Sequence, residues 1–583
     1  MASLEQQIYL PTLSKLGVTN PPKNIDASKI VTEWSDRFFK ALSSDNVDET
    51  VSLILEDGLW RDMLAITWNF RTIFKSENIR KLLNARLAQT KITNLKLSED
   101  KDKQPALVNP NPELIWIQAF FDFETSVGLC SGVFRLVPTP NGEWKAHTVY
   151  TNLEGLKGFP PKAGPYRSHE SNHGFWESQR AKETAYEDRE PTVLIVGGGQ
   201  SGLEVAVRLK YLGVSCLIVE KNARIGDNWR NRYNALCLHD SLADWLEFYA
   251  HSLELDYWTS SEVTSVQRDG KNGEWAVSVA KSDGSKRIFH TKYVVLALGL
   301  GGNTPKMPVI PGMDKFKGKI RHSIHHKRAL DDEGKKVVVV GACTSAHDIS
   351  QDYQHYGVDV TMVQRSSTCI VSVKKGMPLL FGDLYKEGGP PVDICDRINA
   401  SFPIYLQKCV HQMVIPAVME ADKEVVEGLK KVGFKINYGP DDSGWTLMAW
   451  KNAGGYYLEV GASQLIIDGK IKLKNGSIKE FTEDSLVFED GSTLKADVVV
   501  FATGYGNAHD ATRKIFPSEL VDKMKPIWGL TDEGEIQGIW TESGVSNVYF
   551  MLGNLALCRF HSTHIALQIK AKEEGLFTTV YDE

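Results

Sequence analysis

Three closely spaced glycines follow a short apolar run in the sequence LIVGGGQSGLEVAVRLKY, which begins at Leu194. Their GxGxxG spacing is typical of the turn from a buried strand into a helix in dinucleotide-binding folds. The first glycine permits the tight turn, the second lets the backbone approach a pyrophosphate, and the third lets helix and strand pack closely. The start of the helix then offers unpaired amides to an anion. We predict a nucleotide site at Gly197, Gly199, Gln200, Ser201 and Gly202.

An acidic residue ends the next apolar strand. The sequence VSCLIVE closes on Glu220, at the roughly twenty-residue spacing that is typical of a ribose-binding acid. A carboxylate at this position accepts hydrogen bonds from ribose hydroxyls and repels a 2′-phosphate. The first loop is therefore predicted to bind FAD or NAD.

A second strand–turn–helix pattern, VVVVGACTSAHDI, begins at Val337. Its first glycine position holds Gly341 and its third holds Ala346, and alanine is an accepted variant there. The cysteine at the second position is a departure, because a side chain hinders close approach of a pyrophosphate. The predicted loop residues are Gly341, Cys343, Thr344, Ser345 and Ala346.

The strand after this second helix, VDVTMVQ, is followed by Arg365 in place of an acid. A guanidinium binds a 2′-phosphate through bidentate, charge-assisted hydrogen bonds. Opposite charges at the two strand ends predict FAD on the first loop and NADPH on the second. The alternative interpretation is that Arg365 is only a solvated charge at a strand end.

The elements that hold the two loops predict an α/β fold with two Rossmann-like dinucleotide-binding domains. Residues 191–332 are expected to form the first part of an FAD-binding domain, and residues 491–583 its C-terminal part. Residues 333–490 are expected to form an NADPH-binding domain with an inserted region. In that region, IYLQKCVHQMVIPAVMEADKEVVEGLKKVGF has a helical pattern, and later NG and DG turns predict short strands.

Residues 1–155 lack the strand–turn–helix pattern of the two nucleotide loops and are predicted to form a separate domain. SKIVTEWSDRFFKAL has large apolar residues four apart, which predicts a helix, and later aromatic and β-branched runs predict strands. Helices followed by a curved antiparallel sheet resemble the cone-shaped nuclear-transport-factor-like (SnoaL-like) fold, an α+β domain. Trp60 and Trp68 either line a ligand pocket there or belong to the core, and core is the commoner role of large aromatics. Residues 156–190, rich in proline, glycine and charges, are predicted to be a linker with one short polar helix.

Composition narrows the function classes. The chain has 583 residues, 42% of them apolar and 24% charged, with a net charge of −6, which gives no electrostatic reason to expect nucleic acid. The N-terminus lacks a signal-peptide pattern, and no apolar run reaches 18 residues, so we expect no membrane span and a cytoplasmic location. Eight dispersed cysteines without a CxxC pair favour reduced thiols and predict no metal site.

Four stretches resemble the class B flavoprotein monooxygenases, which comprise flavin-containing monooxygenases, Baeyer–Villiger monooxygenases and the plant auxin-forming YUCCA enzymes. The first is the FAD loop with the later RIGDNWR, which in that family runs over the FAD. The resemblance therefore implies cofactor contacts for Asn228, Trp229 and Arg230. The NADPH loop is the second stretch. A third, VVVFATGY, is similar to the family motif that passes close to the flavin, which adds Gly504.

The fourth stretch, FKGKIRHSIHH, is similar to the FxGxxxH fingerprint of the family. Phe316, Gly318 and His322 match it, whereas His326 stands where the family has Tyr, Phe or Trp. The fingerprint links the two domains, so the resemblance implies that His322 positions the backbone and is not an acid or base.

The resemblance implies an FAD- and NADPH-dependent oxidoreductase that inserts one oxygen atom from O₂ into a small organic substrate through a flavin C(4a)-(hydro)peroxide. It implies no particular catalytic side chain, because the cofactor carries the chemistry. The partners expected are the substrate and O₂, and a homodimer stays open. The N-terminal extension is similar to that of fungal members, which points to specialised metabolism.

Two alternatives stay open: an uncoupled NADPH oxidase-like flavoprotein, and a catalytically inactive nucleotide-binding partner protein. A flavin disulfide reductase is disfavoured because it needs a close cysteine pair. One departure bears on the first alternative. After Asp240, relatives continue for some two dozen aromatic- and proline-rich residues, whereas here only Ser241, Leu242 and Ala243 precede DWLEFYA. The flavin face is then more open, or the N-terminal domain covers it.

Overall fold

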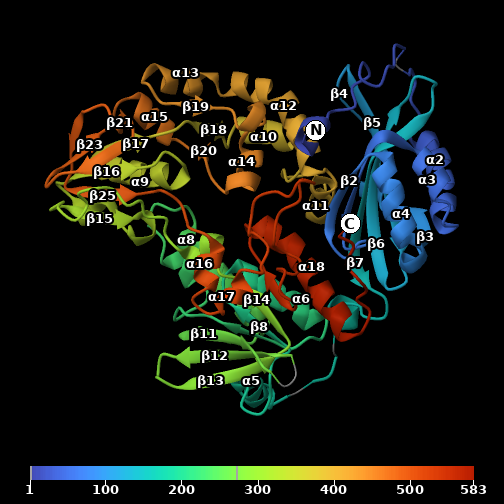
Figure 1. Cartoon of the computed structure of the whole chain (residues 1–583), viewed down its shortest axis with the longest axis horizontal. Coiled ribbons are helices and arrows are strands. Elements are labelled where there is room, and N and C mark those ends of the chain that lie inside the picture. The colour runs from blue at the N-terminus through green and yellow to red at the C-terminus, as the bar shows by residue number, and fades with distance from the viewer. Residues whose placement is uncertain (1–2, 21, 168, 172, 271–272, 583) are drawn as a thin grey trace.

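The computed structural model describes residues 3–20, 22–167, 169–171, 173–270 and 273–582. Figure 1 shows the N-terminal residues in blue on one side and the sheet of the second nucleotide loop on the other. The sheet of the first loop lies below them. Helix α18 (Leu555–Glu573) runs between the lower sheet and the blue region.

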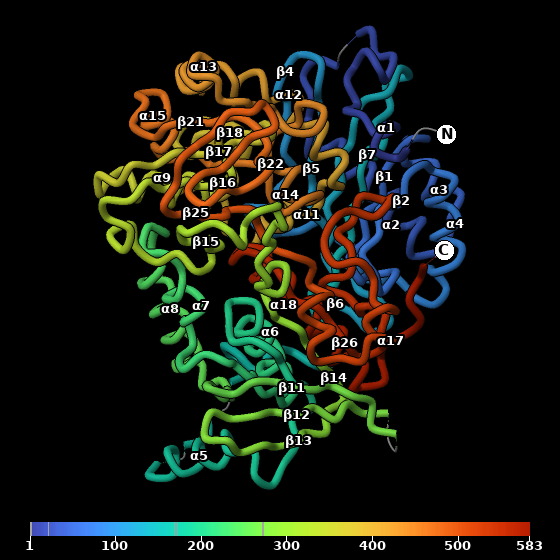
Figure 2. Tube along the Cα trace, turned by 60° about the vertical axis from the view of Figure 1, so that its left-hand side comes forward, coloured from blue at the N-terminus to red at the C-terminus, as the bar shows by residue number. Residues whose placement is uncertain are grey.

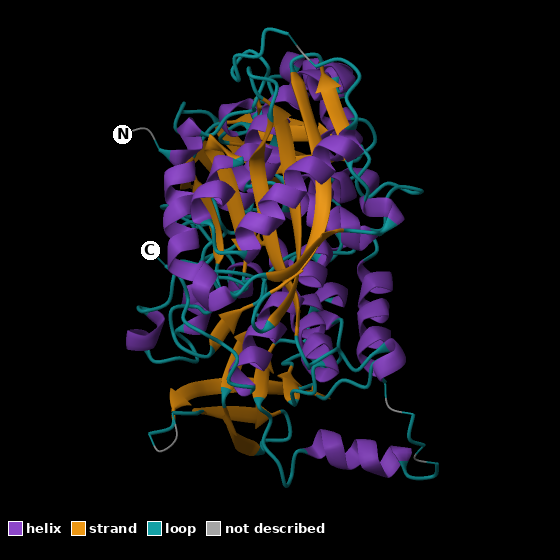
Figure 3. Ribbon diagram, turned by 90° about the vertical axis from the view of Figure 1, so that its right-hand side faces the viewer, coloured by secondary structure: helices purple, strands orange, loops and turns teal. Residues whose placement is uncertain are grey.

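The N-terminal region is one sheet with helices on one face. Its strand order is β2 (Phe70–Phe74), β1 (Ile54–Met63), β7 (Trp144–Leu156), β6 (Gly128–Pro138), β5 (Leu114–Glu124) and β3 (Thr93–Leu97), with β4 (Ala106–Asn111) paired to β5. All pairs are antiparallel except β1 with β7. Figure 3 shows helices in front of these long strands. The helices are α2 (Ala27–Ser43), α3 (Val47–Ser52) and α4 (Ser76–Thr90).

Apolar spacing explains how the first long helix packs. In α2 the residues Val31, Trp34, Phe38 and Leu42 recur at three- and four-residue intervals, and all four are buried against the sheet. The predicted helix is therefore confirmed. Trp60 is fully buried, and Trp68 is 5% exposed. Both tryptophans belong to the core, as expected.

The first glycine loop rises from a parallel five-stranded sheet. Its order is β10 (Tyr257–Trp258), β9 (Cys216–Val219), β8 (Val193–Val196), β14 (Tyr293–Leu296) and β26 (Val548–Phe550). Every residue of β8, β9, β14 and β26 is buried, as is typical of a parallel sheet covered on both faces. Helices α6 (Gln200–Tyr211) and α18 pack against each other beside it. An antiparallel sheet of β11 (Ser261–Arg268), β12 (Trp275–Lys281) and β13 (Lys286–Thr291) lies alongside.

The second loop rises from another parallel five-stranded sheet. Its order is β15 (Lys319–His322), β25 (Val498–Phe501), β16 (Lys336–Val340), β17 (Asp359–Gln364) and β21 (Lys472–Asn475). The first two strands lie outside residues 333–490, so this sheet takes strands from both flanking segments. Helix α9 (Thr344–His355) follows the loop. The predicted α/β class with two Rossmann-like units is confirmed.

The inserted region is mostly helical, as its pattern predicts. Its helices are α10 (Gly376–Phe381), α11 (Val392–Ala400), α12 (Ile404–Ala421), α13 (Lys423–Lys431), α14 (Trp445–Asn452) and α15 (Ala462–Ile467). Short strands accompany them: β18 (Thr368–Ser372), β19 (Ile436–Asn437) and β20 (Tyr456–Glu459) in one sheet, and β22 (Ile478–Phe481), β23 (Ser485–Phe488) and β24 (Thr493–Lys495) in another. Figure 2 shows α12 beside β4 and β5 of the N-terminal sheet, and Met413 of this helix accepts a hydrogen bond from Asn111.

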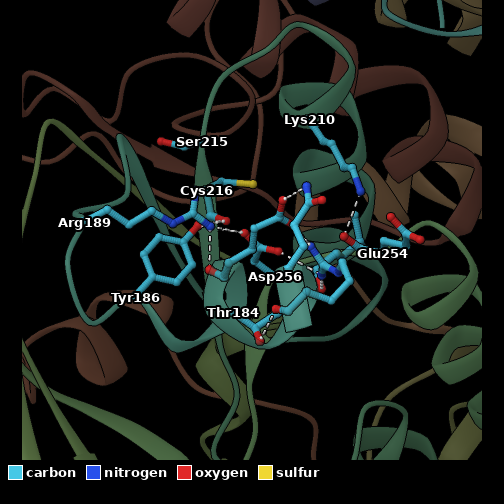
Figure 4. A network of polar contacts seen from close by, with 12 residues as sticks. Thr184, Tyr186, Arg189, Lys210, Ser215, Cys216, Glu254 and Asp256 are labelled. Atoms are coloured by element: carbon cyan, nitrogen blue, oxygen red, sulfur yellow. Dashed lines mark hydrogen bonds and ion pairs between the residues drawn. The ribbon is translucent and has the colours of Figure 1, made fainter. Parts of the chain in front are cut away.

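A short helix in residues 156–190, α5 (Trp176–Ala185), leads into the first sheet. Figure 4 shows the polar network that fastens the chain after it. The Tyr186 hydroxyl lies 3.0 Å from both the Cys216 carbonyl and the Asp256 carboxylate, and Arg189 donates to the same carboxylate at 3.0 Å. The Trp258 indole donates to the Thr184 carbonyl at 2.7 Å. These contacts fix the entry to β8.

Residues 577–582 run back onto the N-terminal sheet. The Phe577 ring centroid lies 4.8 Å from that of Trp68. The Tyr581 amide donates to the Thr67 carbonyl at 2.9 Å, and Arg71 donates to the Tyr581 carbonyl at 2.8 Å. The segment thereby covers the connection between β1 and β2 and contacts the start of β2. In the part of the chain that the structure describes, no helix is long and apolar enough to cross a bilayer.

Candidate functional site

The first loop has the shape that a pyrophosphate needs. Gly197 has a φ of +110°, and a Cβ on it would lie 2.4 Å from the Ala297 carbonyl oxygen. A Cβ on Gly202 would lie 2.1 Å from the Gly197 oxygen, so helix and strand are in direct backbone contact. At Gly199 the nearest atom to a Cβ is the Asn228 side-chain nitrogen at 3.1 Å. The three glycines therefore serve the turn, the close packing and an open face.

The start of α6 is available to an anion. Gly199 is its N-cap and gives no side-chain hydrogen bond to the first turn. Amides at such an uncapped start carry partial positive charge and bind phosphate. Ser201 is buried, and its hydroxyl lies 3.3 Å from the Cys558 sulfur of α18. The loop thus offers backbone groups to a dinucleotide, and the Asn228 side chain is the nearest group to its middle glycine.

Glu220 lies beside the loop, directly after β9. Its Oε2 accepts from the Gly198 amide at 2.7 Å, and its Oε1 accepts from the Asn222 amide at 2.8 Å. The residue is 6% exposed. The hydrogen bonds hold the carboxylate next to the glycine turn, where an adenosine ribose meets the carboxyl edge of such a sheet.

Within the RIGDNWR stretch, two residues lie beside the first loop, whereas Arg230 forms ion pairs away from it. Trp229 donates from Nε1 to the Gln200 side-chain oxygen at 3.3 Å, and Asn228 lies over Gly199, so both adjoin the loop. Arg230 points elsewhere, with its guanidinium donating to Asp227 at 3.0 Å and to two carboxylates of the next helix. That helix is α8 (His239–Ser252), and the two acids are Asp244 and Glu247.

The beginning of α18 joins the same site. Gln200 donates from Nε2 to the Gly553 carbonyl at 3.3 Å, and the Asn554 side chain caps α18 by accepting from the Leu557 amide at 3.0 Å. Gly553 has a φ of +146°, which favours glycine. These residues follow β26, so two strand ends of the first sheet meet here. The glycine turn is the sequence signal for this edge, whereas no local pattern indicates its contact with Gln200.

The second loop has the same positive-φ glycine turn and uncapped helix start as the first, but a cysteine takes the place of the second glycine. Gly341 has a φ of +133°, and a Cβ there would lie 2.5 Å from the Ala502 oxygen. Cys343 is the N-cap of α9, and burial raises the pKa of its thiol, which keeps it neutral. Thr344 is exposed, and Ala346 is buried against the strand. The amides of this helix start are again uncapped.

An acidic residue lies in the first turns of α9. The Tyr233 hydroxyl donates to Asp348 at 2.9 Å and lies 3.4 Å from the Ser345 hydroxyl. Burial raises the pKa of Asp348 to about 6, against hydrogen bonding from Tyr233. The segment after RIGDNWR therefore reaches across to the second nucleotide unit.

Arg365 directly follows β17 at the carboxyl edge of the second sheet, in the place that Glu220 takes in the first. Its side chain is exposed, and among the described residues no hydrogen bond or ion pair joins its guanidinium to another group. Its carbonyl accepts from the Lys435 ammonium at 3.4 Å. A second cation therefore lies close to Arg365.

The fingerprint residues support the crossing between the two sheets. His322 donates from Nε2 to the Gly504 carbonyl at 2.9 Å and accepts at Nδ1 from the Ile324 amide at 3.2 Å. Burial lowers the pKa of His322, so the ring is neutral. Phe316 packs on Gly318, where a Cβ would lie 2.5 Å from its ring. These are contacts that position backbone.

His326 ends the fingerprint inside the protein. It is fully buried, with its Nδ1 3.3 Å from the Tyr353 hydroxyl, which in turn donates to Asp332 at 2.6 Å. The aromatic position of the family is thus filled here by a group in a polar network.

The segment after Asp240 is part of helix α8, which begins at His239, and large apolar side chains are exposed on this helix and at its N-cap. Leu238 is 75% exposed, and on α8 Phe248 is 68% exposed and Trp245 is 47% exposed. Figure 1 places α8 on the side of the molecule away from the blue N-terminal strands. The N-terminal region therefore does not cover this helix. Among the described residues, no group of three or more His, Cys, Asp or Glu forms a candidate metal site.

Comparison with known proteins shows a match between part of this chain and one protein family. Residues 225–514 match the sequence profile described as FMO-like, flavin-binding monooxygenase-like. A probable indole-3-pyruvate monooxygenase of Arabidopsis thaliana, YUCCA10, is 27% identical over 347 residues, covering 54% of this chain and 82% of that protein. Flavin-containing monooxygenase 5 of Rattus norvegicus is 24% identical over 412 residues, covering 60% and 72%. Among solved structures, the flavin-containing monooxygenase from Stenotrophomonas maltophilia has a TM-score of 0.43 at 16% identity, covering 66% and 98%.

Proposed function

Since the chain belongs to the flavin-binding monooxygenase-like family, we propose that it uses FAD and NADPH to transfer one oxygen atom from O₂ to a small organic substrate. The overall balance is substrate, O₂, NADPH and a proton giving oxygenated substrate, water and NADP⁺. The observation that carries the cofactor assignment is the contrast between two strand ends. Glu220 is buried and hydrogen-bonded beside the first loop, whereas Arg365 is exposed and unpaired within the described structure beside the second.

The first loop is assigned to FAD. The amides of Gly199, Gln200 and Ser201 would bind the pyrophosphate, and Glu220 would accept the ribose hydroxyls. Asn228 and Trp229 adjoin the loop, as a segment that runs over the cofactor must. When bound, FAD supplies the redox chemistry that joins NADPH oxidation to O₂ reduction.

The second loop is assigned to NADPH. The helix start at Thr344, Ser345 and Ala346 would hold the pyrophosphate, and Arg365 would bind the 2′-phosphate. His322 ties the fingerprint strand to Gly504, which fixes the crossing between the two sheets. The sheets can then present the two cofactors to each other in a fixed orientation.

The N-terminal region is assigned to the nuclear-transport-factor-like fold. Support comes from three helices on one face of a curved sheet in which β1 pairs parallel to β7 and the other pairs are antiparallel. A cytoplasmic location and a role in specialised metabolism, as in fungal members with this extension, complete the proposal.

The test begins with the purified protein. We expect a yellow protein with a flavin absorbance spectrum, whose flavin is reduced much faster by NADPH than by NADH. Arg365→Gln is expected to lower kcat/KM for NADPH about 10- to 100-fold while leaving NADH nearly unchanged, because one charge-assisted contact to phosphate is lost. Lys423→Gln, an exposed lysine on α13, is the matched control. Equal preference for both coenzymes in wild type and variant would contradict the assignment of the second loop.

The oxygenase step needs a separate measurement. Amines, sulfides, ketones and indole-3-pyruvate form the first panel, the last because it is named for the relatives above. Oxygenated product formed in proportion to the NADPH consumed supports a monooxygenase. Hydrogen peroxide in the same amount as NADPH, with every substrate, would identify an uncoupled oxidase. A colourless protein that binds no flavin would favour an inactive nucleotide-binding partner.

A further inference from the structure

Helix α11 of the inserted region is bound both to the N-terminal sheet and to α18. Glu154 on β7 is joined to Arg397 of α11 by two hydrogen bonds of 2.8 Å, one from Nε and one from Nη2. The two side chains are 27% and 19% exposed. Arg397 holds the pKa of Glu154 below its usual range even though burial alone would raise it. The carboxylate therefore stays charged and paired at neutral pH.

A second face of α11 is bound to α18. Asp396, the residue before Arg397, accepts two hydrogen bonds from Arg559, at 2.8 and 2.6 Å. The Tyr385 hydroxyl donates to the same carboxylate at 3.0 Å. Two adjacent residues of one short helix thus bind partners on two different elements, Arg397 on β7 and Asp396 on α18.

A third set of contacts joins α18 directly to β7. His564 donates from Nε2 to the Asn152 side-chain oxygen at 2.8 Å, and both residues are buried. Asn152 also donates to Glu154 at 2.9 Å, which closes a ring of contacts through β7, α11 and α18. Each element comes from a different part of the chain.

The ring adjoins the first nucleotide loop. Arg559 lies in the first turns of α18, whose start is held by Gln200 through Gly553. Cys558, next to Arg559, contacts Ser201 of the loop. A shift of α11 would therefore be transmitted to the helix start that meets the flavin site.

We propose that Glu154, Arg397, Asp396 and Arg559 form a positioning relay through which the N-terminal domain sets the geometry of the flavin site. The inference rests on the proposed function for the identity of the cofactor. None of the four is a catalytic residue, because they act through the placement of α18. The N-terminal domain is thus a fixed support for the two cofactor-binding domains.

The structure supplies a matched pair of variants. Arg397 has a second acidic partner, Asp393 on its own helix, at 2.9 Å, and the Asp393 side chain is 63% exposed. Glu154→Gln removes the charge and one of the two oxygens that accept from Arg397, whereas Asp393→Asn removes an equal charge from the same arginine and leaves the two-pronged contact with Glu154 intact. Both variants are compared with wild type without cofactor and after FAD addition.

Hydrogen–deuterium exchange and FAD titration test the relay independently of turnover. In hydrogen–deuterium exchange, we expect Glu154→Gln to speed exchange in peptides of both α11 and the first turns of α18. In fluorescence titration, we expect FAD to bind about tenfold more weakly, with kcat reduced more than KM for NADPH rises. Asp393→Asn should change each quantity by less than twofold. The exchanged pair Glu154→Arg with Arg397→Glu should recover part of the FAD affinity.

Faster exchange confined to α11, with FAD affinity unchanged, would overturn the relay and leave a purely structural ion pair. If Glu154→Gln does not fold, Arg397→Lys keeps the charge without the two-pronged contact and is judged by the same readouts. Failure of wild type to bind FAD would instead contradict the proposed function. Exchange in α11 and α18 would still report whether the two helices move together.

Discussion

At the scale of single residues, space decides what each glycine of the first loop does. We expect Gly199→Ala to fold normally, because its Cβ meets only the movable Asn228 side chain at 3.1 Å. It should nevertheless weaken FAD binding at least tenfold, because the methyl group stands where a pyrophosphate approaches. Flavin titration of the cofactor-free variant measures this. Gly270→Ala, which meets nothing within 4 Å, is the control.

Gly202→Ala is expected to lower the stability of the fold itself and not only the binding of FAD. Its Cβ would lie 2.1 Å from the Gly197 oxygen, a backbone atom that moves only with the whole turn. The unfolding free energy of the cofactor-free protein should fall by about 1–3 kcal/mol or more. Urea denaturation without FAD gives the value, and a loss confined to the FAD-bound state would contradict the packing explanation.

At the scale of elements, Arg61 joins three segments. It donates to Glu535 at 2.8 and 2.6 Å, and to the Ala400 and Phe402 carbonyls at 2.7 and 2.9 Å. It thereby satisfies the C-terminal end of α11 and ties it to the segment before β26. Both charged side chains are nearly fully buried.

We expect Arg61→Met to lower the unfolding free energy by about 3–5 kcal/mol, because it leaves a buried carboxylate without its partner. Adding Glu535→Met should restore much of the loss, since two apolar side chains replace the pair. Arg37→Met breaks an exposed pair with Glu49 and should cost less than about 1 kcal/mol. Urea denaturation compares the variants, and equal losses for Arg61→Met and Arg37→Met would refute the argument.

Local sequence could predict the two loops because each is a continuous stretch with its own periodicity and glycine spacing. Glu220 and Arg365 follow from the same local rule, since each comes directly after a strand. Arg230 could not be placed in this way, because its partners belong to the next helix. Glu154 and Arg397 are 243 positions apart, and no nearby pattern marks either of them. The joining of β15 and β25 to the second sheet likewise depends on strand order, which is set by packing across the whole chain.

At the scale of the whole molecule, buried histidines set the pH response. Burial lowers the pKa of several histidines, and for four of these the value reached is about 3 in one case and about 4 in the other three. They are His147, His347, His411 and His564. A pKa below the unfolded value means that the unfolded chain takes up protons first, so folding is favoured most above about pH 6.5.

We therefore expect the unfolding free energy to be level above about pH 6.5 and to fall as the pH drops from there towards 4. Each histidine contributes a slope approaching about 1.4 kcal/mol per pH unit. Urea denaturation between pH 8 and pH 5 tests the trend. His411→Gln should reduce the slope, because it removes one of the side chains whose pKa is lowered by burial. Stability that rises on acidification would contradict this account.

The return of residues 577–582 to the N-terminal sheet has a consequence for biosynthesis. Because translation proceeds from the N-terminus, Thr67 and Trp68 emerge from the ribosome some five hundred residues before Phe577 and Tyr581, which cover them. Thr67 and Trp68 therefore lack these contacts while the strands of both nucleotide-binding sheets are being synthesised. We therefore expect the yield of this protein to fall when a chaperone that binds partly synthesised domains is lost.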